Sequence, residues 1–424
     1  MIQFEDYKQY LSPALAKATD LVMVSGKGCY MTDVKGDRYL DFVQGIAVNA
    51  LGHCHPKIVE AICEQAGKLI NGSFNVVNFE PTLKLAKRMS AITPGDLGCT
   101  FFSNGGAEAN DGAIKLAKAY TKRPSIIAFK GSFHGRTIGA ISVTASNSKY
   151  RKYYEPHMGG VYFATYPCAD LCPAGFTEAQ MTEYCLNDLE SLFRYIVAPE
   201  TVAAILMEPV QGEGGYTVPP VDFIKGVREL CNKHGILLIF DEIQSGYGRT
   251  GKMFASENFD VVPDIMTLGK AIAGGLPMSA VVSTPKIMEE WHAGMHGTTF
   301  GGNPVAAAAA NAVLDQFEDG SLLANCNAMG AYLKEKLVAL KGKYSCISGV
   351  RGLGLMVAMS FCHEDGSPAP EIWTKVKQSC LEQKMLTLNC GVHGNGMRFA
   401  TPLNVTTKEI DEGIAIVEKA IQSL

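Results

Sequence analysis

Apolar residues recur along the chain with the spacing of buried strands and of amphipathic helices. Between about residues 99 and 300, short continuous apolar runs alternate with segments that carry apolar residues every three or four positions. The runs at 100–103, 126–129, 203–207 and 236–241, and the run that begins at 264, predict strands; the segments 107–120 and 223–233 predict helices. Such alternation is typical of an α/β unit with a mostly parallel sheet.

The two ends of the chain show a different pattern. Helices are predicted near 328–340, 371–384 and 408–421, strands near 354–360 and 397–400, and a hairpin with arms at 30–33 and 38–41. The stretch 166–182, which holds prolines and cysteines, predicts an irregular excursion. We therefore expect an N-terminal segment (1–60) that joins a small domain, a large α/β domain (61–321) and a C-terminal small α+β domain (322–424).

Composition and charge exclude several classes of protein. The chain has 424 residues, of which 47% are hydrophobic and 19% charged, as in ordinary globular proteins. A net charge of -4 with interspersed signs offers no basic face for nucleic acid and no polybasic membrane anchor. No apolar run reaches membrane-spanning length, and the N-terminus lacks the pattern of a secretion signal. We expect a cytoplasmic protein without nucleic-acid or membrane partners.

The cysteines argue against a disulfide framework. There are thirteen of them, an odd number, scattered along the chain. Cys168, Cys172 and Cys185 form a local group, but zinc sites usually have four ligands at tighter paired spacing. We expect free structural thiols and no metal site.

Two predicted strands end in residues that suggest a shared chemistry. The strand at 236–241 ends in Asp241, and the run from 264 leads to Lys270 in a glycine-rich turn. Open parallel sheets place their sites at the carboxyl ends of strands. A lysine amine can form a Schiff base with an aldehyde, and a carboxylate can keep a pyridine nitrogen protonated, as pyridoxal phosphate requires. The alternatives are a helix N-cap for Asp241 and a solvated surface amine for Lys270.

A glycine-rich turn at 104–110 (NGGAEAN) lies between a predicted strand and a predicted helix. Glycines allow backbone amides to approach an anion, and the N-terminus of a helix favours negative charge. Glycine turns before helices are common, so this turn alone indicates little.

Residues 241–251 (DEIQSGYGRTG), followed by Lys270, resemble the signature of class III pyridoxal-phosphate-dependent aminotransferases, and the resemblance extends from 40–42 (LDF) to 397–399 (MRF). It implies the fold of aspartate aminotransferase, called fold type I: a large, mostly parallel α/β domain and a smaller α+β domain. It also implies a catalytic pair, Lys270 and Asp241, around the cofactor. The residues that the resemblance assigns to cofactor binding are Gly105, Gly106, Ala107, Phe133, His134, Asp241, Ile243, Gln244, Lys270 and Thr299.

By the same resemblance, Phe133 stacks on the pyridine ring, with His134 beside it, and Gln244 contacts the ring hydroxyl. The family usually has Ser or Thr where Gly105 stands, so main-chain groups would carry more of the phosphate binding. Thr299 matches the residue that reaches the phosphate from a neighbouring subunit, which implies a homodimer, with a tetramer as the alternative.

Residues 208–215 (EPVQGEGG), with Arg136 and Arg398, resemble 4-aminobutyrate aminotransferases within class III. Guanidinium groups bind carboxylates bidentately, so Arg136 would take the distal carboxylate and Arg398 the α-carboxylate of glutamate. Glu213 would pair with Arg398 when no α-carboxylate is present. Two further substrate-site residues follow: Glu208, which would orient Gln211 or groups near Arg136, and Val76, which stands where the subgroup commonly has isoleucine.

The predicted function is transfer of the ω-amino group of 4-aminobutyrate, or a related ω-amino acid, to 2-oxoglutarate by a ping-pong mechanism, giving succinate semialdehyde and glutamate. Acetylornithine aminotransferases share 299–304 (TFGGNP) almost as well, and some class III members racemise or epimerise amino acids. A non-catalytic binding protein of this fold would be expected to lack Lys270 or Asp241 and to carry an added DNA-binding segment.

Overall fold

The structure is a computed structural model, and it describes residues 2–424. Its largest sheet has seven strands in the order β4-β10-β9-β8-β7-β5-β6, and every strand except β10 runs in the same direction. The predicted α/β fold with a mostly parallel sheet is thus confirmed. The strands are β4 (Cys99–Ser103), β5 (Ser125–Phe129), β6 (Val161–Ala164), β7 (Val202–Met207), β8 (Leu237–Asp241), β9 (Ile265–Leu268) and β10 (Ser279–Ser283).

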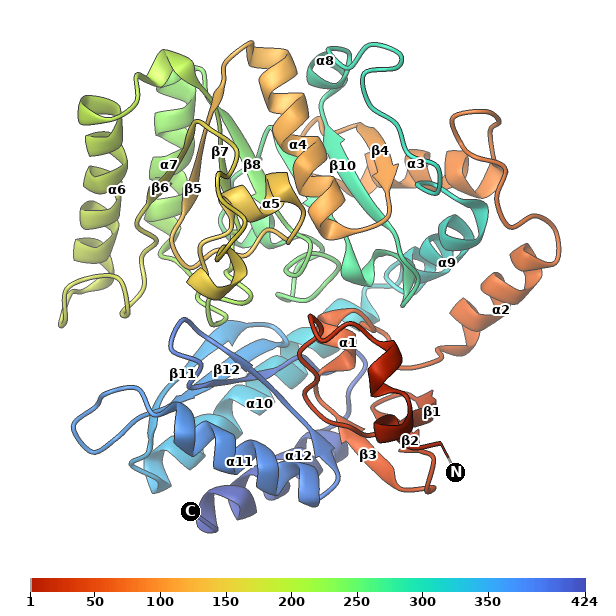
Figure 1. Ribbon diagram of the computed structural model, residues 1–424, viewed down its shortest axis with the longest axis vertical. Coiled ribbons are helices and arrows are strands. Elements are labelled where there is room, and N and C mark those ends of the chain that lie inside the picture. Colours follow the sequence, from red (N-terminus) through yellow and green to blue (C-terminus); the bar gives the residue numbers. More distant parts are fainter. Residues whose placement is uncertain (1) are drawn as a thin grey trace.

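Helices cover both faces of this sheet (Figure 1). Successive side chains of a strand point to opposite faces. Ile127 and Phe129 accordingly pack with α7 (Val221–His234) in one apolar cluster, and Ile126 and Ala128 pack with α4 (Gly106–Thr121) in another. Burial on both faces explains why the central strands are continuous apolar runs in the sequence. The other helices around this sheet are α2 (Pro56–Ala66), α3 (Glu80–Ile92), α5 (Ile138–Val143), α6 (Glu178–Tyr195), α8 (Pro285–Met288) and α9 (Pro304–Asp315).

Two four-stranded sheets form the lower half of the molecule in Figure 1. The first has the order β1-β2-β3-β13, and the second the order β11-β12-β15-β14. Their strands are β1 (Met23–Lys27), β2 (Tyr30–Asp33), β3 (Arg38–Asp41), β11 (Ile347–Leu353), β12 (Met356–Phe361), β13 (Met385–Leu386), β14 (Leu388–Cys390) and β15 (Gly396–Phe399), and the helices beside them are α1 (Gln44–Ala47), α10 (Ser321–Lys343), α11 (Pro370–Glu382) and α12 (Thr407–Gln422).

The pairing of β3 with β13 joins the two ends of the chain. These strands are parallel, with Leu40 opposite Met385, so the predicted hairpin shares a sheet with a C-terminal strand. This pairing supports our proposal that the first sixty residues belong with the C-terminal part. The boundaries at 60/61 and 321/322 stay a prediction.

The sequence analysis missed several helices, of which α6, with 18 residues, is the longest. α6 begins at Glu178, inside the stretch predicted as irregular, and its N-terminus has a capping box formed by Thr177 and Gln180. Its buried positions are Thr182, Cys185 and Leu189, and Met181, Leu186, Leu192 and Phe193 pack partly buried against the same apolar cluster. The helix therefore has an apolar face that the sequence analysis did not use. Within residues 2–424, none of the helices combines the length and the apolar character that crossing a membrane requires.

Candidate active site

Three neighbouring strands of the large sheet end in the residues expected to carry the chemistry. Asp241 is the last residue of β8 and pairs in register with Thr267 of β9. Glu208 directly follows β7, and Lys270 follows β9 after one glycine. Because β7, β8 and β9 are adjacent and parallel, the three side chains start from the same edge of the sheet.

The backbone at Lys270 is unusual for a residue with a side chain. Its φ is 46°, in the left-handed region, and it begins a 3-10 turn, Lys270–Ala273. Such conformations cost of the order of 1–3 kcal/mol and gather at functional sites. Burial lowers the pKa of the Lys270 amine to about 8, although the carboxylates of Asp241 and Glu208 oppose the shift. A pKa near 8 leaves about a tenth of this amine uncharged at pH 7, far more than for an ordinary lysine, and the uncharged amine can act as a nucleophile.

The Asp241 carboxylate is buried and fixed by three polar groups. The Asn110 side chain donates to Oδ2 over 2.8 Å, and His134 Nδ1 lies 2.8 Å from the same oxygen. The Ile243 amide donates to Oδ1 over 3.0 Å. A turn rather than a helix follows Asp241, so this residue is not a helix N-cap.

Asn110 is a member of the site that the sequence analysis did not assign. Its side chain also donates to the His134 carbonyl over 2.7 Å and accepts from Thr267 Oγ1 over 2.8 Å. It thereby joins α4 to the ends of β8 and β9. In the sequence, an asparagine three positions before Ala113 on the apolar face of the predicted helix was a signal of a buried polar group, although it does not name the partner.

The glycine-rich turn forms the N-terminus of α4. Gly105 is the N-cap residue, and a Cβ added there would meet nothing within 4 Å, so the space in front of the turn is open. A Cβ on Gly106 would lie 3.0 Å from the Ile243 side chain, so Ile243 packs directly against this turn. Ala107 follows in the first turn of the helix. This N-terminus has the form of an anion site.

Glu208 holds two turns together. Its Oε1 accepts from the Phe133 amide and its Oε2 from the Gly212 amide, each over 2.8 Å. Burial raises the pKa of the Glu208 carboxyl to about 7, with His134 opposing the shift and the Asp241 charge adding to it. We expected Glu208 to orient Gln211 or groups near Arg136; its hydrogen bonds instead go to main-chain amides beside both.

Glu213 and Arg398 form the ion pair that the sequence led us to expect. Glu213 Oε2 lies 3.1 Å from Arg398 Nη2. Arg398 is 4% exposed, and its Nε and Nη1 are buried without a hydrogen-bond partner. Tyr150, which the sequence analysis did not single out, donates its hydroxyl to Glu213 Oε1 over 3.0 Å. No sequence signal links Tyr150 to a residue 63 positions away.

Arg136 lies beside two aromatic rings. It is exposed, and its guanidinium carbon is 4.7 Å from the centre of the Tyr150 ring and 5.4 Å from that of Phe133. The two rings meet edge to face with centroids 5.5 Å apart. Phe133, Arg136 and Glu213 are therefore linked through Tyr150.

Val76 and Thr299 lie on the surface of the chain. Val76 is 77% exposed, and Thr299 is also exposed. The segments that carry them are joined, because Asn71 Nδ2 donates to the Thr299 carbonyl over 3.3 Å and Asn75 Nδ2 to the Thr298 carbonyl over 2.6 Å. The residue expected to serve a neighbouring subunit and the expected pocket residue thus share one exposed patch.

The local cysteines pack as thiols. Cys172 Sγ and Cys185 Sγ are 3.7 Å apart and both residues are buried, and burial raises the pKa of Cys168 to about 11. Across the part of the chain that the structure describes, no group of three His, Cys, Asp or Glu residues is arranged to hold a metal ion.

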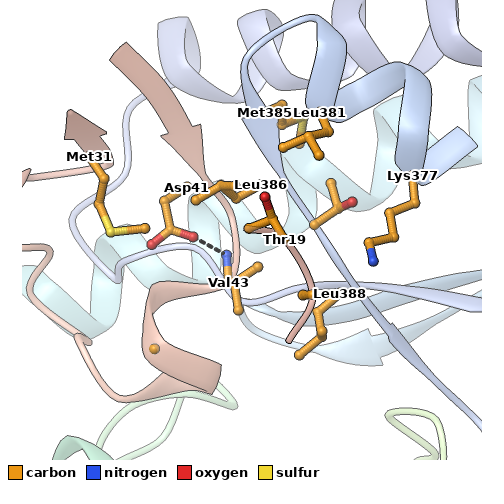
Figure 2. Close-up of a pocket in the computed structure, with 12 residues that line it drawn as sticks. Thr19, Met31, Asp41, Val43, Lys377, Leu381, Met385, Leu386 and Leu388 are labelled. Carbon is orange, nitrogen blue, oxygen red and sulfur yellow. Dashed lines mark hydrogen bonds between the residues drawn. The ribbon is translucent and has the colours of Figure 1, made fainter. Parts of the chain in front are cut away.

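A separate cavity of about 200 Å³ lies among the first sixty residues and the C-terminal part. Figure 2 shows its mainly apolar wall, which includes Met31, Leu381 and Leu388, with the Lys377 side chain at one side. None of the twelve residues that line it belongs to the candidate site.

Comparison with known proteins places the chain in a family. The sequence profile described as Aminotransferase class-III matches residues 12–421. The chain belongs to the class III aminotransferases. It is 36% identical to a probable 4-aminobutyrate aminotransferase of Bacillus subtilis over 98% of this chain and 96% of the relative, and 40% identical to an acetylornithine aminotransferase of Caldanaerobacter subterraneus over the full length of both. A solved amine transaminase from an uncultivated Pseudomonas species, with bound pyridoxal phosphate, is 30% identical with a TM-score of 0.91 and coverage of 97% of this chain and 98% of that one.

This class III aminotransferase uses pyridoxal phosphate, and its substrates are an amine donor and a 2-oxo acid acceptor. The site has features that fit the cofactor. The open N-terminus of α4 suits a phosphate, and the fixed Asp241 carboxylate suits a pyridinium nitrogen. Gln244 Oε1 and His134 Nε2 are buried without a hydrogen-bond partner, as expected of groups whose partner is a ligand.

Proposed function

We propose that this class III aminotransferase moves the ω-amino group of 4-aminobutyrate, or a related ω-amino acid, to 2-oxoglutarate, giving succinate semialdehyde and glutamate by a ping-pong mechanism. The observation that carries the proposal is the ion pair between Glu213 Oε2 and Arg398 Nη2 at 3.1 Å. The charges of both groups influence the pKa of the Lys270 amine, so the pair lies near the reacting centre.

One site must accept two amine donors that differ in their number of carboxylates, and the Glu213–Arg398 pair allows this. 4-Aminobutyrate has one carboxylate, distant from its amine, whereas glutamate carries a second one on the reacting carbon. A buried, unpaired guanidinium beside an apolar carbon would be a costly uncompensated charge. Glu213 neutralises Arg398 while 4-aminobutyrate is bound. The α-carboxylate of glutamate then takes its place, and Glu213 moves away.

The remaining residues divide between cofactor and substrate. When bound, the cofactor supplies an electron sink for the carbon that loses a proton. Lys270 holds it covalently and moves the proton. Asp241 keeps the ring nitrogen protonated, Phe133 stacks on the ring, Arg136 takes the distal carboxylate and Val76 borders the substrate. The other cofactor contacts proposed are Gly105, Gly106 and Ala107 for the phosphate, and His134, Ile243 and Gln244 for the ring.

Assembly and location are part of the same proposal. Thr299 and Val76 lie on one exposed patch, where a second copy of the chain would complete the site, so we propose a homodimer, with a tetramer as the alternative. The thirteen free cysteines support the reducing cytoplasm as its compartment.

Acetylornithine transamination is the second candidate, because the relative at 40% identity carries that name. Its donor, like 4-aminobutyrate, presents an amine distant from a carboxylate. Both candidate functions therefore require Glu213 to pair with Arg398 while the ω-amine donor is bound. They differ in the space that the distal end of the donor needs.

A panel of amines tests the proposal. 4-Aminobutyrate, 5-aminovalerate, acetylornithine and alanine are each supplied with 2-oxoglutarate, and glutamate formation is measured. Chiral analysis of single amino acids without a 2-oxo acid runs in parallel. We expect the largest kcat/KM for an unsubstituted ω-amino acid. A preference for acetylornithine would select the second candidate, and racemisation without glutamate formation would contradict both.

A further inference from the structure

Glu213 has two hydrogen-bond partners that come from opposite parts of the chain. Its Oε2 faces Arg398 of β15 at 3.1 Å, and its Oε1 accepts from the Tyr150 hydroxyl at 3.0 Å. Tyr150 ends a short 3-10 turn, Ser148–Tyr150, after α5 beside the large sheet. Each carboxylate oxygen of Glu213 thus has one partner. Glu213 contacts Tyr150 and Arg398 at the same time, and we call this the paired arrangement.

We propose that Tyr150 is a positioning residue that sets how readily Glu213 releases Arg398, and hence how well the enzyme accepts substrates with one or with two carboxylates. The proposal deepens the proposed function and rests on it. A hydrogen bond to a charged acceptor is stronger than one between neutral groups. If Glu213 moves away from Arg398, it leaves this bond, so the Tyr150 hydroxyl favours the paired arrangement.

The Tyr150 hydroxyl can have this effect because its ring is held in place. The ring lies edge to face against Phe133 at 5.5 Å and under the Arg136 guanidinium at 4.7 Å. Aromatic and cation–π contacts of this kind restrain a side chain without using its polar end. The donor therefore stays at a fixed position, and the Glu213 carboxylate is the member of the pair that must move.

The same ring connects the two candidate carboxylate sites. Arg136 stacks on the Tyr150 face, and Arg398 is reached through the Tyr150 hydroxyl and Glu213. The ring and the hydroxyl therefore have separable effects. Losing the hydroxyl should change only the release of Arg398, whereas losing the ring should also disturb Arg136.

Binding of unreactive acids to the cofactor-loaded protein separates these effects. Glutarate has two carboxylates and needs Arg398 free; butyrate has one and does not. A ligand that binds one of two arrangements gains apparent affinity when that arrangement becomes more populated. In Tyr150→Phe, calorimetry should show glutarate binding about tenfold tighter, the change expected from losing a hydrogen bond to a charged group. Butyrate should bind no tighter.

Two further variants serve as controls. Tyr153→Phe makes the same chemical change at a side chain that is 84% exposed and should leave both affinities unchanged. Tyr150→Leu, which also removes the ring, should weaken butyrate binding through Arg136. If Tyr150 had only a structural role, Tyr150→Phe would weaken the binding of both glutarate and butyrate, because damage to the fold does not improve binding.

The outcomes distinguish this inference from the function on which it rests. If Glu213→Gln tightens glutarate binding and Tyr150→Phe does not, the role of Tyr150 is overturned and the Glu213–Arg398 exchange stands. If Arg398→Ala leaves the preference of glutarate over butyrate unchanged, the exchange itself is wrong, and the proposed function and this inference fail together. Weaker glutarate binding in Tyr150→Phe would also overturn the inference.

Discussion

Lys270 has a strained backbone conformation, and its amine is buried near two carboxylates. Burial lowers its pKa to about 8 from the ordinary value of 10.5, and the charge of Asp241 limits the shift. Only the uncharged amine can attack the aldehyde of the cofactor. The protonation of one side chain therefore controls how the cofactor is captured.

The rate of covalent capture should rise with pH through a midpoint near 8. Protein freed of cofactor is mixed with pyridoxal phosphate between pH 6 and pH 10, and the new visible absorption band is followed. Reduction with borohydride and peptide mapping then locate the bond. Lys270→Ala is the control, since any pH dependence it keeps comes from noncovalent binding. A rate that still rises without levelling off up to pH 10, or a label on another lysine, would contradict the assignment.

Replacing Asp241 should lower the turnover rate more than it lowers the affinity for the cofactor. In Asp241→Asn, the amide can still contact its neighbours, but it no longer holds a proton on the ring nitrogen by its charge. We expect turnover to fall by about 10²–10³-fold, as when a fixed electrostatic group is removed from an active site, while part of the cofactor stays bound. Single-turnover kinetics with the cofactor content measured in the same sample tests this. Near-normal turnover would show that another group keeps the ring charged.

At the scale of elements, parallel pairing explains why the reactive residues could be foreseen. β7 and β8 are buried on both faces, so each is a continuous apolar run that stops at a carboxylate. β9 is also fully buried and differs only in holding one threonine, Thr267. Asp241 and Lys270 were recognised from that pattern, together with the family resemblance. Asn110 and Tyr150 were missed because they act through pairings across 131 and 63 residues, which no local pattern records.

Helix prediction failed for α6 although this helix has an apolar face. α6 packs Cys185, Leu189 and Leu192 into the apolar cluster that also holds residues of β5 and β7, whereas α4 was recognised from the spacing of its apolar residues. The prolines and cysteines at 167–173 led us to extend the irregular stretch over the first turn of this helix. The irregular stretch predicted at 166–182 ends five residues earlier in the structure, at Thr177, before α6 begins.

The segments around Val76 and Thr299 should form an interface between two copies of the chain. Mixing Lys270→Ala protein with Thr299→Ala protein should produce hybrid dimers in which one site has both intact residues. Activity should rise well above the sum of the two variants after unfolding and refolding together. Each variant refolded alone is the control. A fully active monomer at assay concentration would rule out a site completed by a partner.

At the scale of the whole molecule, the Glu213–Arg398 pair joins the large sheet to the second small sheet. Glu213 lies in the loop after β7, and Arg398 lies in β15. The same loop is fastened to the small sheet by the Gly391 amide, which donates to the Glu213 carbonyl over 2.9 Å, and by Arg351 Nε, which donates to the Gly215 carbonyl over 2.6 Å. These two hydrogen bonds to main-chain carbonyls hold the loop in place while the Glu213 side chain is free to exchange partners.

Single-turnover rates of the two half-reactions test the central claim most directly. Arg398→Ala and Glu213→Gln are each compared with the unchanged enzyme, using 4-aminobutyrate and glutamate separately. Arg398→Ala should slow the glutamate half-reaction at least tenfold more than the 4-aminobutyrate half-reaction, because it removes a charged hydrogen-bond partner of the α-carboxylate. Glu213→Gln should have the opposite preference, because Arg398 is then left uncompensated beside the monocarboxylate. Equal losses in both half-reactions for both variants would contradict the account and leave Glu213 and Arg398 as a structural ion pair.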